Sequence, residues 1–555
     1  MKYLIIGGVA GGASTAARLR RLDEHATIIL LEKGAHISYA NCGLPYYIGD
    51  VITDRNKLFV QTASSFKERF NIDTRVNSEV INIDPTTKMV TVKHLVTQEI
   101  YQETYDKLVL SPGAEPIKPP LPGMQLSGIF TLRNVIDTDR IKAFAQKKQN
   151  GKAVVIGAGF IGLEMAENLH QIGMEVTIIE MSNQILAPVD YGIAAIAQQH
   201  IRTKGVKLLL QTAVEGFEEN GDGLLVKIRN KQPIEADLVI FSIGVKPDTK
   251  LAEMAGLALG EGKGILVNEF LQTSNPSIYA VGDAITFKNP LTGKLMPTYL
   301  AGPANKQGRI CANNLVMGNQ FTYDGSINTA IVKLFDLTIA VTGLAAKHLK
   351  TLSIPHLVST THSGSHAGYY PDAQTMTIQI QFSPNNHQLL GAQIIGKEGV
   401  DKRIDLLSSI IQRKSTIHEL TALEHAYAPP YSSAKDPVNM AGFVAENLVT
   451  GKLKVAYWDD AQLLNNNSIL IDVRTTEEYS KEHIDGAINI PVDNLREKLA
   501  EIPTNKPIFI YCQVGLRGYL AQRILVQNNF QEVKNLSGGF LLWNQVNKEM
   551  AYLNN

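Results

Sequence analysis

A glycine-rich turn that occurs twice constrains the fold of this chain more than any other feature. In the first copy an apolar run, Tyr3–Ile6, leads into GGVAGG, and a second apolar run ends at Glu32. In the second copy Ala153–Ile156 leads into GAGFIG, and the next apolar run ends at Glu180. A strand, a glycine turn, a helix, a second strand and an acid about 20 residues beyond the turn are typical of a βαβ unit that binds a dinucleotide.

Each part of this pattern has a physical role. Glycines let the backbone approach a pyrophosphate, the helix N-terminus supplies positive potential, and the acid accepts hydrogen bonds from a ribose. The first copy has Val9 at the middle glycine position, so by itself it could be an ordinary strand–helix turn. The second copy is complete, and the pair therefore predicts two dinucleotide sites in one chain.

Length, charge and cysteine usage limit the class of protein. A chain of 555 residues is too long for one hydrophobic core, and its formal net charge of zero gives no reason to expect nucleic acid or a membrane surface. No apolar run is long enough to span a bilayer, and MKYLIIGGVAGG breaks at its glycines before the arginines, unlike a signal peptide. Three cysteines are too few for a disulfide framework, so we expect a cytoplasmic enzyme with reduced thiols.

Three further segments carry a family resemblance. YDKLVLSPGAEP (105–116), GVKPDT (244–249) and TSNPSIYAVGDA (273–284) resemble the flavin family of pyridine nucleotide–disulphide oxidoreductases. The resemblance implies an α/β chain with two Rossmann-like domains, which bind FAD and NAD(P), followed by an α+β dimerisation domain. It places the FAD domain at 1–115 and 247–325, the NADH domain at 116–246, the dimerisation domain at 326–447 and a linker at 448–456.

The same resemblance assigns FAD to the first glycine turn and NADH to the second. It implies that FAD is bound by Gly7, Val9, Ala10, Gly12, Glu32, Lys33, Asn41, Ser111, Pro112, Gly113, Gly282, Asp283 and Ala301. It implies that NADH is bound by Gly157, Gly159, Phe160, Ile161, Gly162, Glu164, Glu180 and Gly244. Glu180 would repel a 2′-phosphate and Met181 offers no compensating cation, so NADH is expected in preference to NADPH.

The segment SYANCGLPYYIGD selects the chemistry. Cys42 has no neighbouring partner, because Tyr47 stands where many members of the superfamily have a second cysteine. A lone cysteine can hold a mixed disulfide, a persulfide or a sulfenic acid, but it cannot close a local disulfide. The alternative is a buried structural cysteine, which is what we expect for Cys311, packed on a helix.

The pattern SxANCGLPY, with RLRR upstream and YYP and YAPPYSSAKDP downstream, resembles the coenzyme A–disulphide reductase branch. This resemblance implies a mixed disulfide between Cys42 and coenzyme A. It implies contacts with that coenzyme from Arg18, Arg21, Ser38, Asn41 and Lys435, and from Tyr369 and Tyr427 of the second subunit of a homodimer. Charge-assisted bonds from arginine to phosphate suit this role, although a solvated helix face would also explain the two arginines. The Tyr427 hydroxyl could protonate a leaving thiolate, whereas interface packing is the alternative.

A different pattern begins near residue 457. ILIDVRTTEEYSKEHIDGAINIP, PIFIYCQVGLRGYLA and LSGGFLLW resemble the rhodanese family and imply an α/β rhodanese domain at 457–555. In CQVGLR, successive backbone N–H groups between Cys512 and Arg517 would form an anion nest, which lowers the pKa of a cysteine. The spacing is C-x4-R, whereas a phosphatase needs C-x5-R. An inactive docking module is the alternative, and Asp472, Arg474 and His483 are expected to be structural.

Together these features predict an enzyme that passes electrons from NADH through FAD to Cys42. The expected substrates are coenzyme A persulfide or polysulfide and coenzyme A disulfide, and Cys512 would accept sulfane sulfur from a small-molecule donor. Two alternatives share the lone cysteine: an NADH oxidase or peroxidase that cycles through a sulfenic acid, and a non-enzymatic redox sensor that responds to NADH. No metal site, nucleic acid or membrane partner is expected.

Overall fold

The computed structural model describes residues 1–460 and 467–554, so 461–466 and 555 of the predicted rhodanese domain lie outside the described residues. The chain divides into two compact units, one of residues 1–181 and 212–328 and one of residues 182–211 and 329–555. Within the described ranges, no helix combines the length and the apolar character needed to cross a membrane.

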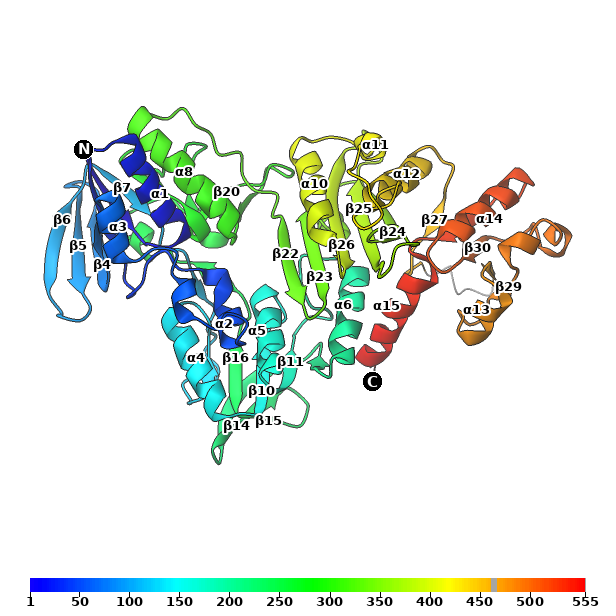
Figure 1. Ribbon diagram of the computed structural model, residues 1–555, viewed down its shortest axis with the longest axis horizontal. Coiled ribbons are helices and arrows are strands. Elements are labelled where there is room, and N and C mark those ends of the chain that lie inside the picture. The colour runs from blue at the N-terminus through cyan, green and yellow to red at the C-terminus, as the bar shows by residue number, and fades with distance from the viewer. Residues whose placement is uncertain (461–466, 555) are drawn as a thin grey trace. The chain divides into compact units, whose positions relative to one another are not determined.

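The first unit contains a parallel sheet built from the N-terminal glycine pattern (Figure 1). Its strands, in spatial order, are β19 (Ile278–Ala280), β7 (Lys107–Leu110), β1 (Lys2–Ile6), β2 (Thr27–Leu31) and β3 (Asp73–Arg75). Helices α1 (Ala10–Leu22) and α8 (Ala301–Met317) lie side by side (Figure 1). The strands read as continuous apolar runs because a parallel sheet is covered on both faces.

The second glycine pattern forms its own parallel strands in the same unit. Strands β11 (Glu175–Ile179), β10 (Lys152–Ile156), β16 (Leu238–Phe241) and β9 (Ile129–Phe130) run in this order, with α5 (Phe160–Gln171) after β10 and α4 (Val135–Lys147) after β9. Smaller antiparallel elements are β4 (Ser78–Asp84), β5 (Met89–His94), β6 (Ile100–Thr104), β13 (Val214–Asn220), β14 (Gly223–Ile228), β15 (Ile234–Ala236), and the pair β8 (Ala114–Pro116) and β17 (Val245–Pro247). The remaining elements are α2 (Leu44–Ile48), α3 (Ala63–Phe70), α7 (Lys250–Met254), β18 (Ile265–Leu266), β20 (Ile285–Lys288) and β21 (Leu295–Pro297).

The second unit contains an antiparallel sheet. The strand order is β22 (Ala330–Leu334), β23 (Leu337–Gly343), β26 (Leu389–Gly396), β25 (Thr375–Phe382) and β24 (Leu357–Gly364). Helices α10 (Val400–Gln412) and α12 (Pro437–Val449) pack on this sheet, and α9 (Ala346–Thr351) and α11 (Ile417–Ala422) are short.

Helix α6 (Tyr191–Thr203) also packs on this sheet, although its sequence lies inside the predicted NADH domain of 116–246. The Asp190 carboxylate accepts hydrogen bonds from Gln379 and Gln393, each at 2.6 Å, and from the backbone N–H groups of Ala346 and Lys347. A buried carboxylate needs such donors, and they all come from the second unit. This is why 182–211, including β12 (Lys207–Leu209), groups with residues 329–555.

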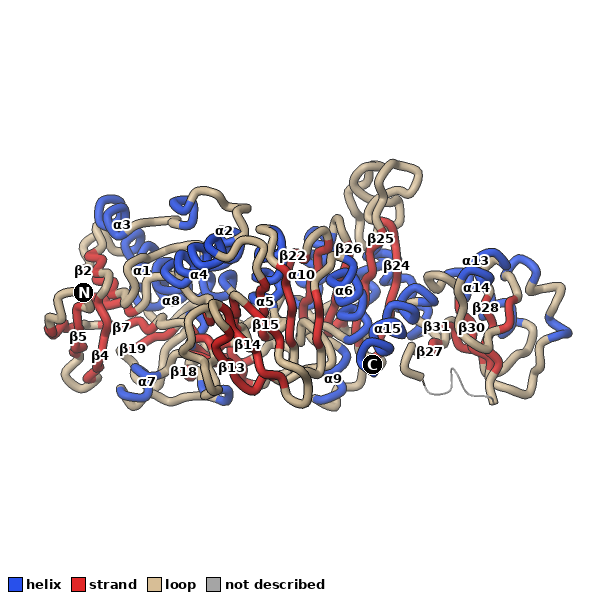
Figure 2. The backbone as a smooth tube through the Cα atoms, turned by 90° about the horizontal axis from the view of Figure 1, so that it is seen from below, coloured by secondary structure: helices blue, strands red, loops and turns tan. Residues whose placement is uncertain are grey.

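The C-terminal part of this unit is a parallel α/β sheet (Figure 2). Its strands are β27 (Val455–Ala456), β31 (Val533–Leu536), β30 (Ile508–Tyr511), β28 (Ile469–Asp472) and β29 (Ile488–Asn489), and its helices are α13 (Thr476–Lys481), α14 (Leu516–Gln527) and α15 (Gly539–Asn554). Helix α15 packs against α6. There the fully buried carboxylate of Glu549 accepts hydrogen bonds from Gln198, Gln199 and Arg202.

Candidate active sites

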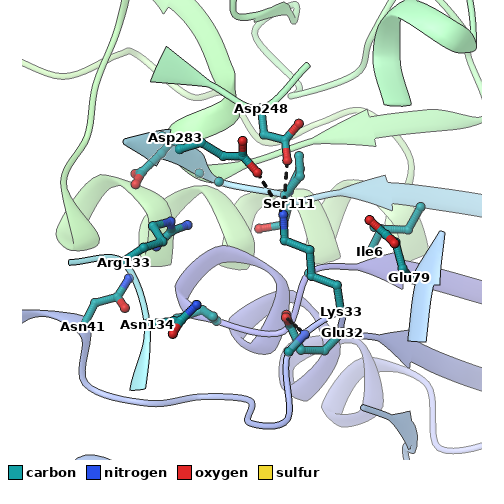
Figure 3. Close-up of a pocket in the computed structure, with 18 of the residues that line it drawn as sticks. Ile6, Glu32, Lys33, Asn41, Glu79, Ser111, Arg133, Asn134, Asp248 and Asp283 are labelled. Atoms are coloured by element: carbon teal, nitrogen blue, oxygen red, sulfur yellow. Dashed lines mark hydrogen bonds and ion pairs between the residues drawn. The ribbon is translucent and has the colours of Figure 1, made fainter. Parts of the chain in front are cut away.

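A cavity of about 770 Å³ lies in the first unit, where several parallel strands end (Figure 3). It is lined by the turn after β1, by Glu32 and Lys33 after β2, by 111–113 after β7, and by Gly282 and Asp283 after β19. The carboxyl ends of parallel strands meet at one edge of the sheet, which is where open α/β sheets bind ligands.

All the predicted FAD residues line this cavity except Gly12 and Ala301. A side chain at Gly12 would place its Cβ 1.8 Å from the carbonyl oxygen of Gly7, so Gly12 is needed for close packing of α1 on β1. Ala301 is the exposed first residue of α8, and Ala304 lines the cavity instead. Gly7 has φ +97°, and a Cβ there would lie 2.0 Å from the Ser111 carbonyl oxygen.

The polar groups of the cavity fit a dinucleotide such as FAD. The Glu32 carboxylate lines the cavity and accepts hydrogen bonds from the N–H groups of Gly8 at 2.8 Å and Gly34 at 2.7 Å, which hold it in place. The buried Oδ1 of Asn41 accepts no hydrogen bond from any residue that the structure describes. Arg133, which sequence reasoning missed, also lines the cavity (Figure 3). An unpaired buried acceptor, a guanidinium and a close glycine turn together suit a ligand with donors and phosphates.

The second glycine turn repeats this geometry. Gly157 has φ +99°, and a Cβ at Gly162 would lie 2.0 Å from the Gly157 carbonyl oxygen. The Glu180 carboxylate accepts a hydrogen bond from the Ala158 N–H at 2.9 Å, as Glu32 does in the first turn. Gly159 precedes α5 with open space around it, as a site for a pyrophosphate requires. The other predicted NADH residues lie at the start of α5 or after β16: Phe160, Ile161, Glu164 and Gly244.

Cys42 lies on a short turn, Asn41–Gly43, that precedes α2. Its side chain is exposed, which excludes the buried structural cysteine. Partial desolvation and the carboxylates of Glu164 and Asp283 raise the pKa of its thiol. Since Glu164 belongs to the second dinucleotide motif and Asp283 to the first cavity, the sulfur lies within electrostatic reach of both.

A tyrosine–glutamate pair next to Cys42 was not predicted from the sequence. The Tyr46 hydroxyl donates a hydrogen bond to Glu164 at 3.3 Å. Burial raises the pKa of Glu164 to about 7 with help from Glu167, although the bond from Tyr46 opposes the shift. Tyr46 follows Cys42 by one helical turn, a spacing that could have identified it. The pair can hold a proton near neutral pH.

Two of the predicted coenzyme A residues, Arg18 and Ser38, have different surroundings in the first unit. Arg18 donates a hydrogen bond to Asn313, and desolvation and the neighbouring cations Arg309 and Arg21 lower its pKa. Arg20, by contrast, is buried and donates to backbone carbonyl groups, so it is structural. Ser38 has φ +45° and donates its N–H to the Gly8 carbonyl group. Arg309, on α8, is a cation that sequence reasoning missed.

Tyr369 and Tyr427 lie in the second unit and form a pair. Both side chains are exposed, and their hydroxyl groups lie 2.6 Å apart, a hydrogen bond that raises the pKa of Tyr369. Behind them a fully buried ion pair joins the two loops: Arg403 donates to Asp436 at 2.8 Å and to the Ser365 carbonyl group at 2.9 Å. Lys435 is exposed next to Asp436.

The second reactive cysteine, Cys512, follows β30 and is 1% exposed. Its sulfur accepts a hydrogen bond from the Gly515 N–H at 3.1 Å, and Gly515 has φ +109° at the start of α14. Arg517, on α14, forms two hydrogen bonds with Glu478, at 2.6 and 2.7 Å. Sequence reasoning placed Arg517 at the end of the loop and missed its partner Glu478. Asp472 and Arg474 form a buried ion pair, in keeping with the structural role expected of them.

Two dinucleotide turns that converge on one exposed cysteine, with a second cysteine loop in a separate α/β domain, define a flavin-dependent disulfide oxidoreductase joined to a sulfurtransferase fold. The chain belongs to the pyridine nucleotide-disulphide oxidoreductase family, which matches residues 1–304. The dimerisation domain of this family matches 329–437, and a rhodanese-like domain matches 459–546. These matches confirm the predicted fold class.

Several known proteins are similar to most or all of this chain. The coenzyme A disulfide reductase of Staphylococcus haemolyticus is 37% identical over 80% of this chain and all of its own length. The crystal structure of reduced Bacillus anthracis CoADR-RHD is 48% identical, with a TM-score of 0.96 over 99% of this chain and 98% of that one. The NAD-dependent persulfide reductase of A. fulgidus is 37% identical, with a TM-score of 0.92 over 98% of this chain and 100% of that one.

Proposed function

We propose that this chain uses NADH to reduce the sulfur–sulfur bond of coenzyme A persulfide, polysulfide or disulfide, and that its rhodanese domain transfers sulfane sulfur through Cys512. The single observation that carries the proposal is the setting of Cys42. It is the exposed cysteine, while Cys311 and Cys512 are buried. A lone exposed cysteine between two dinucleotide motifs suits a mixed disulfide or a persulfide with a small thiol.

The chain's residues divide the remaining tasks. The thiolate of Cys42 attacks the substrate disulfide, a thiolate leaves, and the substrate's other half stays bound to Cys42 as a mixed disulfide. The Tyr427 hydroxyl, hydrogen-bonded to Tyr369, protonates the leaving thiolate. When bound, FAD would be held by the residues that line the first cavity, and it would supply the electron pair, taken from NADH, that cleaves the new sulfur–sulfur bond.

Coenzyme A is recognised through its phosphates. Arg18, Arg21 and Arg309 lie close enough for their charges to interact, and mutual repulsion favours an anionic ligand among them. Ser38 and Asn41 both precede Cys42 closely in the sequence, and Asn41 lines the first cavity. Lys435 and the two tyrosines would contact the coenzyme from the second unit of the other subunit.

The assembly and the compartment follow from this chemistry. The match to a dimerisation domain supports a homodimer, and a closed C2 dimer lets each subunit complete the site of its partner. The cycle needs Cys42 and Cys512 as thiols, which a reducing cytoplasm maintains.

Cys42→Ser tests the proposal against a matched change at the other cysteine. The purified Cys42→Ser protein should bind FAD and accept electrons from NADH, because neither step uses sulfur. Its NADH turnover with coenzyme A persulfide and disulfide should fall at least ~100-fold. Cys512→Ser should keep that turnover but lose sulfurtransferase activity. Steady-state NADH oxidation and thiocyanate formation measure the two activities separately.

Three outcomes would contradict the proposal. Turnover retained in Cys42→Ser would remove the cysteine from the mechanism. Faster turnover with oxygen or peroxide than with any coenzyme A substrate would favour an oxidase or peroxidase that uses a sulfenic acid. NADH binding without turnover of any substrate would favour a redox sensor.

A further inference from the structure

The Cys512 loop is electrostatically neutralised by a residue outside it. Arg517 is held by both carboxylate oxygens of Glu478, at 2.6 and 2.7 Å, and both side chains are about one-third exposed. Glu478 is fixed further by a capping box, in which its carboxylate accepts from the Thr475 N–H at 3.0 Å. A bidentate pair with a second anchor is a well-defined geometry, so a bound anion would have to compete with Glu478 for the positive charge of Arg517, whose pKa is raised mainly by Glu478 and to a lesser extent by Cys512.

The second arginine that contacts the loop is neutralised in the same way. Arg474 donates to the Gln513 side chain at 3.3 Å, but its guanidinium is bonded to both oxygens of the buried Asp472. Each arginine at this site is therefore paired with its own carboxylate. A dianionic donor such as thiosulfate would have to displace one of these carboxylates or bind without a counter-charge.

The rim of the loop is apolar. Val514 lies in the loop and is 36% exposed, and Leu516 and Leu520 are 60% and 47% exposed. Leu516 and Leu520 are four residues apart on α14, so they lie on one face of the helix. Adjacent exposed apolar side chains at a reactive centre indicate a surface that binds apolar or uncharged groups. Because Cys512 itself is 1% exposed, a donor can reach it only with a terminal atom.

We propose that Cys512 takes sulfane sulfur from a persulfide at the end of an uncharged alkyl arm, and that Glu478 sets this specificity against thiosulfate-like dianions by neutralising Arg517. The inference rests on the proposed sulfurtransferase activity and deepens it. The arm lies over the apolar rim of Val514, Leu516 and Leu520, and the terminal sulfur enters the loop.

The transfer step needs no further reactant. The thiolate of Cys512 attacks the outer sulfur of R–S–SH, the sulfur–sulfur bond of this persulfide breaks, and R–S⁻ leaves with the electron pair of that bond. The products are Cys512–S–SH and a thiolate that takes a proton from water. No net oxidation occurs, because the sulfane sulfur passes from one thiol to another.

The test compares two donors in the full-length FAD-containing protein with cyanide as acceptor. Thiosulfate and N-acetylcysteamine persulfide are supplied separately, and the ratio of their kcat/KM values for thiocyanate formation is measured. The wild-type ratio should favour the persulfide at least ~10-fold. Glu478→Gln frees the charge of Arg517, keeps the capping box, and should shift the ratio toward thiosulfate at least ~5-fold. That shift should shrink at about 0.5 M salt.

Two variants sharpen the result. Glu477→Gln removes the same charge from an exposed neighbour on α13 that pairs with Lys481, and the ratio should not change. Leu520→Gln should lower kcat/KM for the persulfide several-fold and leave the thiosulfate value within twofold. Circular dichroism and FAD content confirm that each variant is folded.

The failures are distinguishable because this assay uses neither NADH nor Cys42. A wild-type enzyme that uses thiosulfate as well as the persulfide would overturn the inference, as would an unchanged ratio in Glu478→Gln or an equal shift in Glu477→Gln. If neither donor yields thiocyanate while NADH-dependent reduction proceeds, the sulfurtransferase part of the proposed function is wrong, and the inference is wrong with it.

Discussion

The same sequence pattern forms two glycine turns, and in each turn one acid is held by a backbone N–H group. Glu32 and Glu180 each follow a central strand, and each carboxylate accepts a hydrogen bond from an N–H of its own glycine turn, Gly8 or Ala158. The acid is thus held in place before any ribose binds. Because each carboxylate is already oriented, it loses less conformational entropy when a ligand binds, and its remaining lone pairs are available to that ligand.

The position of Glu180 predicts a preference for NADH. Its carboxylate would lie against a 2′-phosphate, and the exposed side chain of Met181 supplies no positive charge. The wild-type kcat/KM should favour NADH over NADPH at least ~10-fold, about 1.4 kcal/mol. Glu180→Ser should reduce that preference, whereas Glu219→Gln on the exposed strand β13 should keep it. Equal efficiency with both nucleotides in the wild type would show that Glu180 does not reach the ribose.

Glu164 predicts a pH dependence of stability. Its pKa is raised to about 7, above the value of about 4.3 in an unfolded chain, so the folded state binds the proton more tightly. Stability from this group is full at low pH and is lost as the pH rises through 7. Glu164→Gln should therefore gain stability relative to wild type between pH 5 and pH 8, by at most about 3 kcal/mol. Urea unfolding at both pH values measures this, and a constant difference would refute the shifted pKa.

Between elements, buried polar pairs decide which loops lie together. Arg403 on α10 and Asp436 at the start of α12 are both fully buried, and Arg403 also reaches the Ser365 carbonyl group. Burial disfavours the charged form of Asp436, but hydrogen bonds from Arg403 and Ser432 lower its pKa overall. The pair positions the loops that carry Tyr369 and Tyr427.

For this reason the substitution Asp436→Asn should destabilise the folded protein. It leaves the guanidinium of Arg403 buried without a counter-charge, and the free energy of unfolding should fall by about 3–5 kcal/mol. In the folded fraction kcat should fall more than KM rises, because the role proposed for the tyrosines is to protonate the leaving thiolate. Asp401→Asn, at an exposed position of α10, the helix that carries Arg403, is the control and should change neither quantity. An Asp436→Asn protein as stable as wild type would show that the pair is not a constraint.

For the whole molecule, the proposed homodimer gives a complementation experiment. Cys42→Ser chains and Tyr427→Phe chains should each be inactive as homodimers. If the two residues of one site come from different subunits, a mixed dimer regains one intact site. Co-refolding equal amounts should restore up to about a quarter of wild-type activity. Size-exclusion chromatography gives the assembly state. A fully active monomer, or no recovery in verified mixed dimers, would contradict the shared site.

The sequence by itself determined the local chemistry. Glycines at 7 and 157 and the acids at 32 and 180 specify dinucleotide turns, because only glycine fits beside the backbone of a neighbouring strand. The lone Cys42 and the C-x4-R loop were also readable as patterns, since each lies within a few consecutive residues. Such features depend on contacts of short sequence separation, which a pattern can record.

Only the tertiary structure decided the pairings between distant segments. Glu478 neutralises Arg517 and Glu164 lies near Cys42, although each pair is far apart in the sequence. Helix α6 groups with the second unit because Asp190 binds glutamines of β25 and β26, and because Glu549 of α15 binds its other end. When two charged residues are far apart in the sequence, no local pattern shows that they will pair. Folding selects that partner, because an unpaired polar group that is buried costs more free energy than most single contacts supply.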